Sequence, residues 1–214
     1  MPKRSANSDS SKVCAFRKLG VVGSALALLF VFNLKLHAQN KKIRHPAQTS
    51  TILPGLRRVF HATLTDISIE ANPGWDAEES YDETRRIYRL VFSNPQDSSQ
   101  TFLSCLVEPY HGSTSDSAHW NKLKASIRES YGNRGIAVHD LGETLSFGSQ
   151  ADSSGILARY ELLAKHDDYL EYVDAVLGRT ELVLVTAPVK PEEYQARIPY
   201  LRNVAESLKL HGVK

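Results

Sequence analysis

Cysteine is scarce in this chain: there are two, Cys14 and Cys105, among 214 residues. A hydrophobic run lies between them, so a membrane would separate the two thiols if that run stayed embedded in it. No cysteine directly follows the run, which excludes a lipoprotein signal. We interpret Cys105 as a buried strand residue that acts as a small hydrophobe, with a reactive thiol as the alternative.

The sequence also lacks the short motifs of catalysis and cofactor binding. It contains no His-x₃-His or Cys-x₂-Cys spacing, no Gly-x-Ser-x-Gly, no P-loop and no Gly-x-Gly-x-x-Gly. The nearest approaches to a metal site are His166-Asp167-Asp168 and the pair His111 and His119. We interpret the first as a solvated turn and the polar, glycine-flanked segment 148–155 as a loop. No catalytic, cofactor-binding or metal-binding residue is therefore assigned, and the prediction is a protein that is not an enzyme.

A large excess of charge of one sign is missing as well. The chain has 26 basic and 24 acidic residues, and residues 1–38 hold six of the basic ones and one acid. The rest of the chain is therefore slightly acidic, with 20 basic and 23 acidic residues. Nucleic-acid binding needs a clustered positive face, so this balance argues against it.

A hydrophobic segment stands near the N-terminus. Leu19 to Leu34 is a run of 16 uncharged residues directly behind Arg17 and Lys18. This is the pattern of a secretory signal, for which Leu36-His37-Ala38 offers a cleavage site. The alternative is an uncleaved anchor through residues 19–36, although 16 helical residues span about 24 Å and a hydrocarbon core roughly 30 Å. Either way, residues 1–38 place the rest of the chain outside the cytoplasm, as a secreted, periplasmic or membrane-anchored protein.

Residues 39–56 are polar, contain two prolines and follow no period, so they are predicted to form a linker. Beyond it, residues 57–214 form the predicted domain. A strand-like alternation begins near Val59, and strands are expected over the following ranges. They are Thr65–Glu70, Arg86–Phe92, Thr101–Glu108, Ile136–Asp140, Glu143–Phe147, Gly155–Leu163, Tyr169–Leu177 and Glu181–Ala187, the last being the most apolar and so the central one.

Two helices are expected between and after these strands. Trp120, Leu123, Ile127 and Tyr131 follow helical spacing within Ser117–Tyr131. A last helix is predicted from Pro191 to Leu210, with a buried stripe formed by every third or fourth residue. The predicted fold class is α+β, an antiparallel β-sheet with packed helices, preceded by an N-terminal hydrophobic helix.

Two further groups of residues have both a structural and a functional interpretation. The acidic run Glu78-Glu79 and Asp82-Glu83, with arginines beyond it, is interpreted as a wet hairpin edge, and the alternative is a charged docking edge for a partner. Trp75 and Trp120 are interpreted as core anchors rather than as a ligand platform.

The alternating strand Ile67–Ala71 runs into the turn Asn72-Pro73-Gly74-Trp75, and the chain closes with a strand and a helix ending in Ala205-Glu206-Ser207-Leu208-Lys209-Leu210. In these features the sequence resembles PsbP-like domains over about residues 59–210. The family includes the photosystem II accessory subunit PsbP and bacterial envelope lipoproteins. The resemblance implies a fold that binds another protein without catalysis. It carries no ligand residue onto this sequence.

The sequence thus predicts a non-enzymatic extracytoplasmic binding or accessory domain without cofactors. It would present a sheet face or groove to a protein of the cell envelope or to a hydrophobic ligand. The alternative is an exported metal-dependent hydrolase that uses the loop residues His166 and His111 with nearby aspartates.

Overall fold

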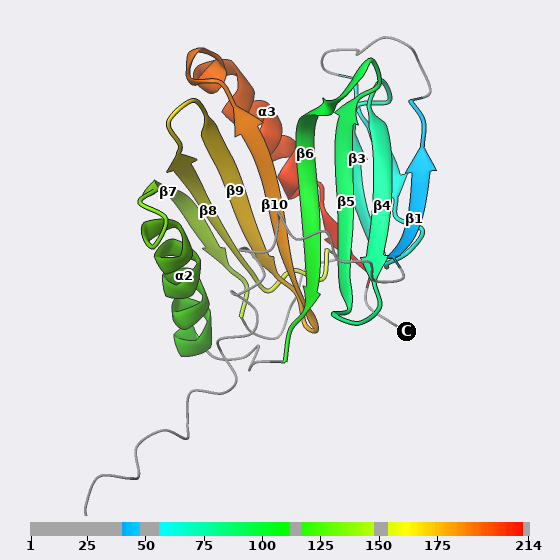
Figure 1. Ribbon diagram of the computed structural model, residues 1–214. Helices are drawn as coiled ribbons and strands as arrows, with labels where there is room; N and C mark the ends of the chain where they lie inside the picture. Colours follow the sequence, from blue (N-terminus) through cyan, green and yellow to red (C-terminus); the bar gives the residue numbers. More distant parts are fainter. Residues whose placement is uncertain (1–39, 48–55, 112–116, 148–153, 212–214) are drawn as a thin grey trace, which may run out of the picture. The chain divides into compact units, whose positions relative to one another are not determined.

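A computed structural model describes residues 40–47, 56–111, 117–147 and 154–211 (Figure 1). The chain divides into two compact units, Met1–Leu34 and Lys35–Lys214, and every described residue belongs to the second. The predicted hydrophobic helix and the cleavage site at Ala38 lie outside the described residues. Within the described ranges, no helix is both long and apolar enough to span a bilayer.

Eight antiparallel strands of the described chain form one sheet, in the spatial order β1-β4-β5-β6-β10-β9-β8-β7. Figure 1 shows β1 and β7 at the two opposite margins of this sheet. The strands are β1 (Asn40–His45), β4 (Asp76–Asp82), β5 (Ile87–Asn94), β6 (Asp97–Pro109), β7 (Ala137–Leu145), β8 (Ala158–Lys165), β9 (Leu170–Leu177) and β10 (Glu181–Val189).

Strands β6 and β10 join the two halves of the sheet. Cys105 lies opposite Val185 in this pairing, and both side chains are fully buried. The predictions that Cys105 is a buried strand residue and that Glu181–Ala187 is a central strand are therefore confirmed. Burial raises the pKa of the Cys105 thiol to about 12, which keeps it protonated and unreactive.

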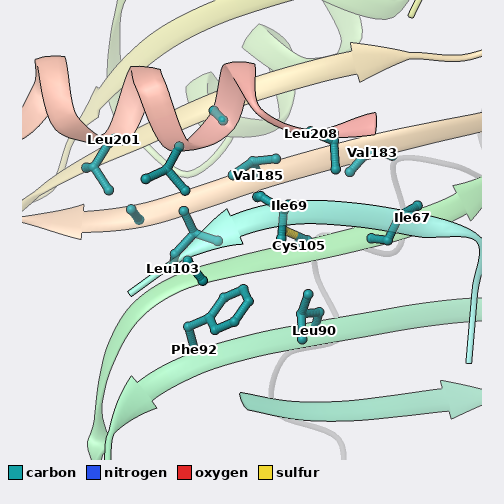
Figure 2. Packing of buried hydrophobic residues seen from close by; sticks show 14 of the residues in the cluster. Ile67, Ile69, Leu90, Phe92, Leu103, Cys105, Val183, Val185, Leu201 and Leu208 are labelled. Atoms are coloured by element: carbon teal, nitrogen blue, oxygen red, sulfur yellow. The ribbon is translucent and has the colours of Figure 1, made fainter. Parts of the chain in front are cut away.

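A second layer covers one face of the large sheet. It consists of a three-stranded sheet in the order β11-β3-β2 and of helix α3. The bounds are β2 (Arg58–His61), β3 (Ile67–Ala71), α3 (Tyr194–Glu206), which a short 3₁₀ turn precedes, and β11 (Lys209–Leu210). Figure 2 shows Ile67 and Ile69 of β3 and Leu201 of α3 packed against side chains of β5, β6 and β10. Because one face of β3 and one stripe of α3 are apolar, both bury that side here.

Helix α2 (Ser117–Gly132) lies on strands β7 and β8. Tyr160 and Glu161 are neighbours on β8, yet the first contacts α2 and the second contacts α3. Successive side chains of a strand point to opposite faces, so α2 and α3 cover opposite faces of β8. The four apolar residues predicted for the buried stripe of α2 are all buried.

Four predictions of secondary structure need correction. Residues 40–45 of the predicted linker form β1, because their cationic side chains pair with β4. The acidic run around Glu78 is the interior strand β4. Segments 136–140 and 143–147 belong to one strand, β7, interrupted by a bulge. The last helix ends at Glu206 rather than Leu210, because the chain turns there into β11.

A fully buried carboxylate ties three parts of the domain together. The Glu79 side chain of β4 accepts hydrogen bonds from the backbone N–H groups of Thr63 and Leu64 and from the Tyr88 hydroxyl, at 2.9 to 3.1 Å. Nε2 of His45 on β1 lies 2.6 Å from the same carboxylate. Glu79 is 0% exposed, so these contacts take the place of the hydrogen bonds that water gives to an exposed carboxyl group.

We expect Glu79→Gln to lower the free energy of unfolding by at least about 2 kcal/mol, because an amide cannot accept all of these bonds. The neighbouring Glu78→Gln is the control. Glu78 is partly exposed and pairs with Lys42 and Arg44 at the surface, so its loss should cost less than about 1 kcal/mol. Urea unfolding of the full-length protein measures both values. Equal losses in the two variants would contradict the role given to Glu79.

Candidate functional site: the edge strand β7 and helix α2

Strand β7 forms one margin of the large sheet. In the described part of the chain it pairs with β8 alone, so one side of its backbone has no strand partner. Seven of its nine residues are exposed, and Leu145 retains 51% of its surface. The opposite margin, β1, carries Lys41, Lys42 and Arg44, and cations of this kind protect an edge from further pairing. Strand β7 contains no lysine, arginine or proline.

A bulge divides β7 into two parts. The register with β8 shifts between Asp140 and Gly142. Bulges twist an edge strand and limit continuous pairing. An added strand would therefore pair with a short segment, Ala137–Asp140 or Gly142–Leu145, and not with the whole edge.

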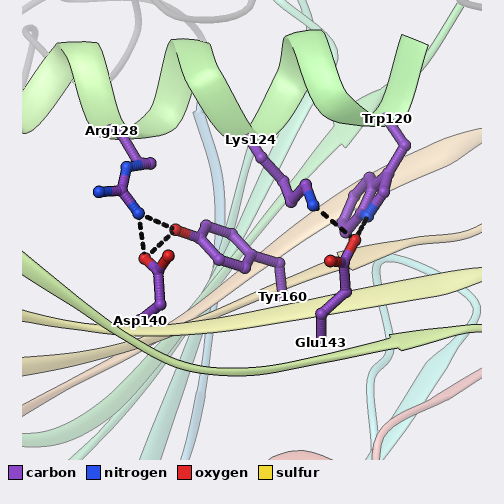
Figure 3. Close-up of polar contacts among 6 residues, drawn as sticks. All are labelled: Trp120, Lys124, Arg128, Asp140, Glu143 and Tyr160. Atoms are coloured by element: carbon purple, nitrogen blue, oxygen red, sulfur yellow. Dashed lines mark hydrogen bonds and ion pairs between the residues drawn. The ribbon is translucent and has the colours of Figure 1, made fainter. Parts of the chain in front are cut away.

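Polar contacts fix α2 beside this edge (Figure 3). Nε1 of Trp120 donates a hydrogen bond of 2.6 Å to Glu143 of β7, and Nζ of Lys124 lies 2.7 Å from the same oxygen. The Trp120 ring is 1% exposed, so only its N–H reaches the polar edge. The prediction that Trp120 is a core anchor is confirmed, and the same holds for the buried ring of Trp75.

A second set of contacts lies one helical turn further along α2. The Tyr160 hydroxyl of β8 donates 2.5 Å to Asp140, and Arg128 of α2 forms an ion pair with the same carboxylate. Burial and the hydrogen bond to Asp140 raise the pKa of Tyr160 to about 12, so the hydroxyl remains a donor. Both carboxylates of β7 are thus used to hold α2, while seven of the nine β7 residues stay exposed in the described chain.

The residues of the predicted turn His166-Asp167-Asp168 are either engaged within the fold or exposed. Nε2 of His166 lies 2.9 Å from Glu171, and its ring stacks on Tyr169 with centroids 4.2 Å apart. Asp167 and Asp168 are exposed in the turn between β8 and β9. Across the four described ranges, no three His, Cys, Asp or Glu side chains form a group that could hold a metal ion.

The other candidate segments have structural explanations as well. Strand β4 lies between β1 and β5, so Glu78 and Glu79 do not form a sheet edge. Of the glycine-flanked loop, only Ser154 and Gly155 are described. Gly155 has φ of +76°, and a Cβ there would lie 2.4 Å from the carbonyl oxygen of Leu210, so close backbone packing requires glycine.

One serine–histidine contact was not expected from the sequence. The Ser68 hydroxyl of β3 and Nε2 of His211 lie 2.8 Å apart, and the His61 ring is 6.5 Å from that of His211. Ser68 is 3% exposed. A nucleophile must reach its substrate, so the burial of Ser68 argues against nucleophilic catalysis by this pair.

Comparisons with known proteins give a likeness of structure alone. No protein-family model matches the chain, and no curated protein matches its sequence. The solution structure of cyanobacterial PsbP (CyanoP) from Synechocystis sp. PCC 6803 is similar, with a TM-score of 0.48 and 11% identity. The match covers 76% of this chain and 98% of that one. It is a PsbP protein, of the group that the sequence resembles.

The crystal structure of the Saccharomyces cerevisiae Ran-binding protein Mog1p is also similar. Its TM-score is 0.43 and its identity 10%, over 73% of this chain and 96% of that one. Likeness at this level concerns chain architecture, so function has to be argued from the residues of this chain.

We expect Glu143→Ala to loosen α2 from the edge, because the Trp120 N–H and the Lys124 ammonium lose their shared acceptor. The loss of stability should be about 1–3 kcal/mol. Glu129→Ala removes an exposed carboxylate from α2 itself and should cost less than about 0.5 kcal/mol. Amide hydrogen exchange of α2 should accelerate only in Glu143→Ala. Unchanged exchange of α2 in that variant would contradict the role given to Glu143.

Proposed function

We propose that this chain is a non-catalytic binding domain that acts outside the cytoplasm and presents the β7 edge, flanked by α2, to a protein partner. The observation that carries the proposal is the exposed, unpaired side of β7 in the described sheet. An exposed sheet edge offers a row of backbone donors and acceptors to an extended segment of another chain.

The position of α2 supports binding at this edge. Lys124 and Arg128 hold the helix to Glu143 and Asp140 through side chains that lie on one face of β7. The contacts orient the helix without covering the backbone edge, so a partner strand would meet both β7 and the exposed surface of α2. Backbone hydrogen bonds would supply affinity, and the side chains of α2 would supply specificity.

A protein partner is favoured over a small hydrophobic ligand. Between α3 and the sheets, where the fold class would allow an apolar cleft, Ile198, Leu201 and Val204 are buried against β3 and β10. Ligand sites of this kind need a concave apolar space with a few polar groups. Packed side chains occupy this region instead.

The polar groups that converge in the described chain support a non-catalytic role. Glu79 holds the segment before β3, Glu143 holds α2, and His166 is engaged by Glu171. Each of these groups makes at least one polar contact that holds an element of the fold in place. A catalytic group has to be free to exchange protons or bonds with a substrate.

The proposed location rests on the N-terminal sequence. Arg17 and Lys18 precede the apolar run Leu19–Leu34, and Ala38 offers a cleavage point two residues before β1 begins at Asn40. Cleavage there would leave β1 whole, whereas a retained run would connect to the domain through only a few residues.

A photo-crosslinking amino acid at Thr144 of β7 is expected to trap a defined protein partner in the cells that make this chain. The same group at Val59 of β2 is the control, because Val59 is a strand residue that is also 51% exposed. Leu145→Glu should remove the Thr144 adduct, and Val59→Glu should leave it unchanged. Equal adducts at both positions, or none at Thr144, would refute binding at β7.

Cell fractionation should find the protein outside the cytoplasm. N-terminal sequencing should give Gln39 if the leader is cleaved, and the intact chain should be in the membrane fraction if it is retained. Full-length protein that is soluble in the cytosol would contradict export. The crosslinking experiment tests binding at β7 independently of this result.

A further inference from the structure

A buried ionic cluster lies between α3 and the large sheet, apart from the β7 edge. We call it the α3 cluster, and it consists of Arg159 and Glu161 of β8, Tyr172 and Asp174 of β9, and Arg202 of α3. Asp174 is 0% exposed and Arg159 is 8% exposed. Charged side chains are rarely buried to this degree unless they are paired, so this part of the core needs a separate explanation.

Two arginines link the helix and the sheet in opposite directions. Nη2 of Arg159 donates 3.1 Å to the carbonyl oxygen of Ala205 in the last turn of α3. Arg202 reaches back from α3 and places Nε and Nη2 each 2.8 Å from Oε2 of Glu161. The helix is thus held at its C-terminal end by a cation of the sheet, where helix carbonyls lack intrahelical donors.

The carboxyl group of Asp174 lacks hydrogen-bond donors in the described chain. Its Oδ2 lies 3.0 Å from Nη1 of Arg159, but the two groups do not have hydrogen-bond geometry. Neither oxygen of Asp174 accepts a hydrogen bond, and the buried Tyr172 hydroxyl has no partner in the described chain either. An ionised carboxylate in this position would be desolvated without the donors that usually stabilise it.

The charged and titratable groups around Asp174 come from every neighbouring element. Arg159 and Glu161 face it from β8, Tyr172 from its own strand, Arg202 and Glu206 from α3, and Cys105 from β6. On β10, Val183 and Val185 of the same core cluster are apolar. The two arginines are therefore opposed by two other carboxylates, so little positive potential remains to hold a charge on Asp174.

We propose that the α3 cluster is a proton-sensitive latch, in which Asp174 holds a proton while α3 is docked and releases it to water when α3 lifts from the sheet. Docking then takes up one proton, and acidification strengthens the attachment of α3. The latch depends on the fold alone and would operate whether or not β7 binds a partner.

The sign of the pH dependence follows from the environment of Asp174. Burial raises its pKa from an ordinary 3.8 to about 7, and Arg159 opposes this increase only in part. The stabilising contribution of the bound proton is complete below pH 3.8, where the open form is protonated too. It declines as the pH rises from 3.8 and is fully lost above about 7.

The test is urea unfolding of the full-length protein and of its D174N variant between pH 5 and pH 8. The unfolding constant of the parent divided by that of D174N should rise about tenfold per pH unit from pH 5 to pH 7 and then level off. Glu108, whose pKa burial also raises to about 7, is unchanged in both proteins and cancels in the ratio. A ratio that is independent of pH would overturn the proposal.

Native-state hydrogen exchange locates the effect. Between pH 5 and pH 7, the opening constant of the Val204 and Ala205 amides in the parent, divided by that in D174N, should rise as the unfolding constant does. These amides should open at a lower free energy than those of β6, which report global unfolding. Equal exchange in α3 would show that the proton is not linked to helix docking. If D174N does not fold, carboxyl carbon NMR of Asp174 in the parent decides: a midpoint near 7 supports the latch, and one below 4 contradicts it.

Discussion

The pairing of β6 with β10 is the constraint on which the rest of the structure depends. Within the described chain it is the single connection between the strands β1-β4-β5-β6 and β10-β9-β8-β7 of the large sheet. Ser104 and Thr186, 82 residues apart in sequence, share a hydrogen bond of 2.8 Å across it. Because the pairing is formed between distant residues, closing it requires ordering much of the chain first. Through β9 and β8, this pairing connects β7 to the rest of the sheet.

Buried and half-buried carboxylates attach the remaining elements to this sheet. Glu79 fixes β1 and the segment before β3, Glu143 fixes α2, and Glu161 fixes α3 through Arg202. Each contact joins a strand of the large sheet to a different element or segment of the fold. A buried polar group that lacks some of its hydrogen-bond partners destabilises the fold. These contacts therefore act mainly by favouring one arrangement of the elements, and less by adding net stability. Asp174 is the exception, because neither of its oxygens accepts a hydrogen bond in the described chain.

Local patterns in the sequence predicted a large part of this fold. The 3, 4, 4 spacing from Trp120 to Tyr131 identified α2, and the apolar run of β10 identified the central strand, because both signals are contained in a few adjacent residues. Strands β1 and β4 were missed. Their sequences are NKKIRH and DAEESYD. They form strands because Lys42 and Arg44 pair with Glu78, and this pairing joins residues far apart in the sequence.

The candidate site was not predicted either, because the contact of Trp120 with Glu143 exists only once β7 lies beside α2. The two cations of α2, Lys124 and Arg128, are opposite in charge to the two carboxylates of β7, Glu143 and Asp140. This complementarity could have indicated the site.

The large sheet is continuous through the pairing of β6 with β10, and β7 is its exposed edge. Amide hydrogen exchange of the full-length protein at residue resolution tests this arrangement most directly. The account predicts that the amides of β6 and β10 exchange last and together, only on global unfolding, while the β7 amides that point away from β8 exchange early. Uniform protection along β7 in the isolated protein, or independent exchange of β6 and β10, would contradict it.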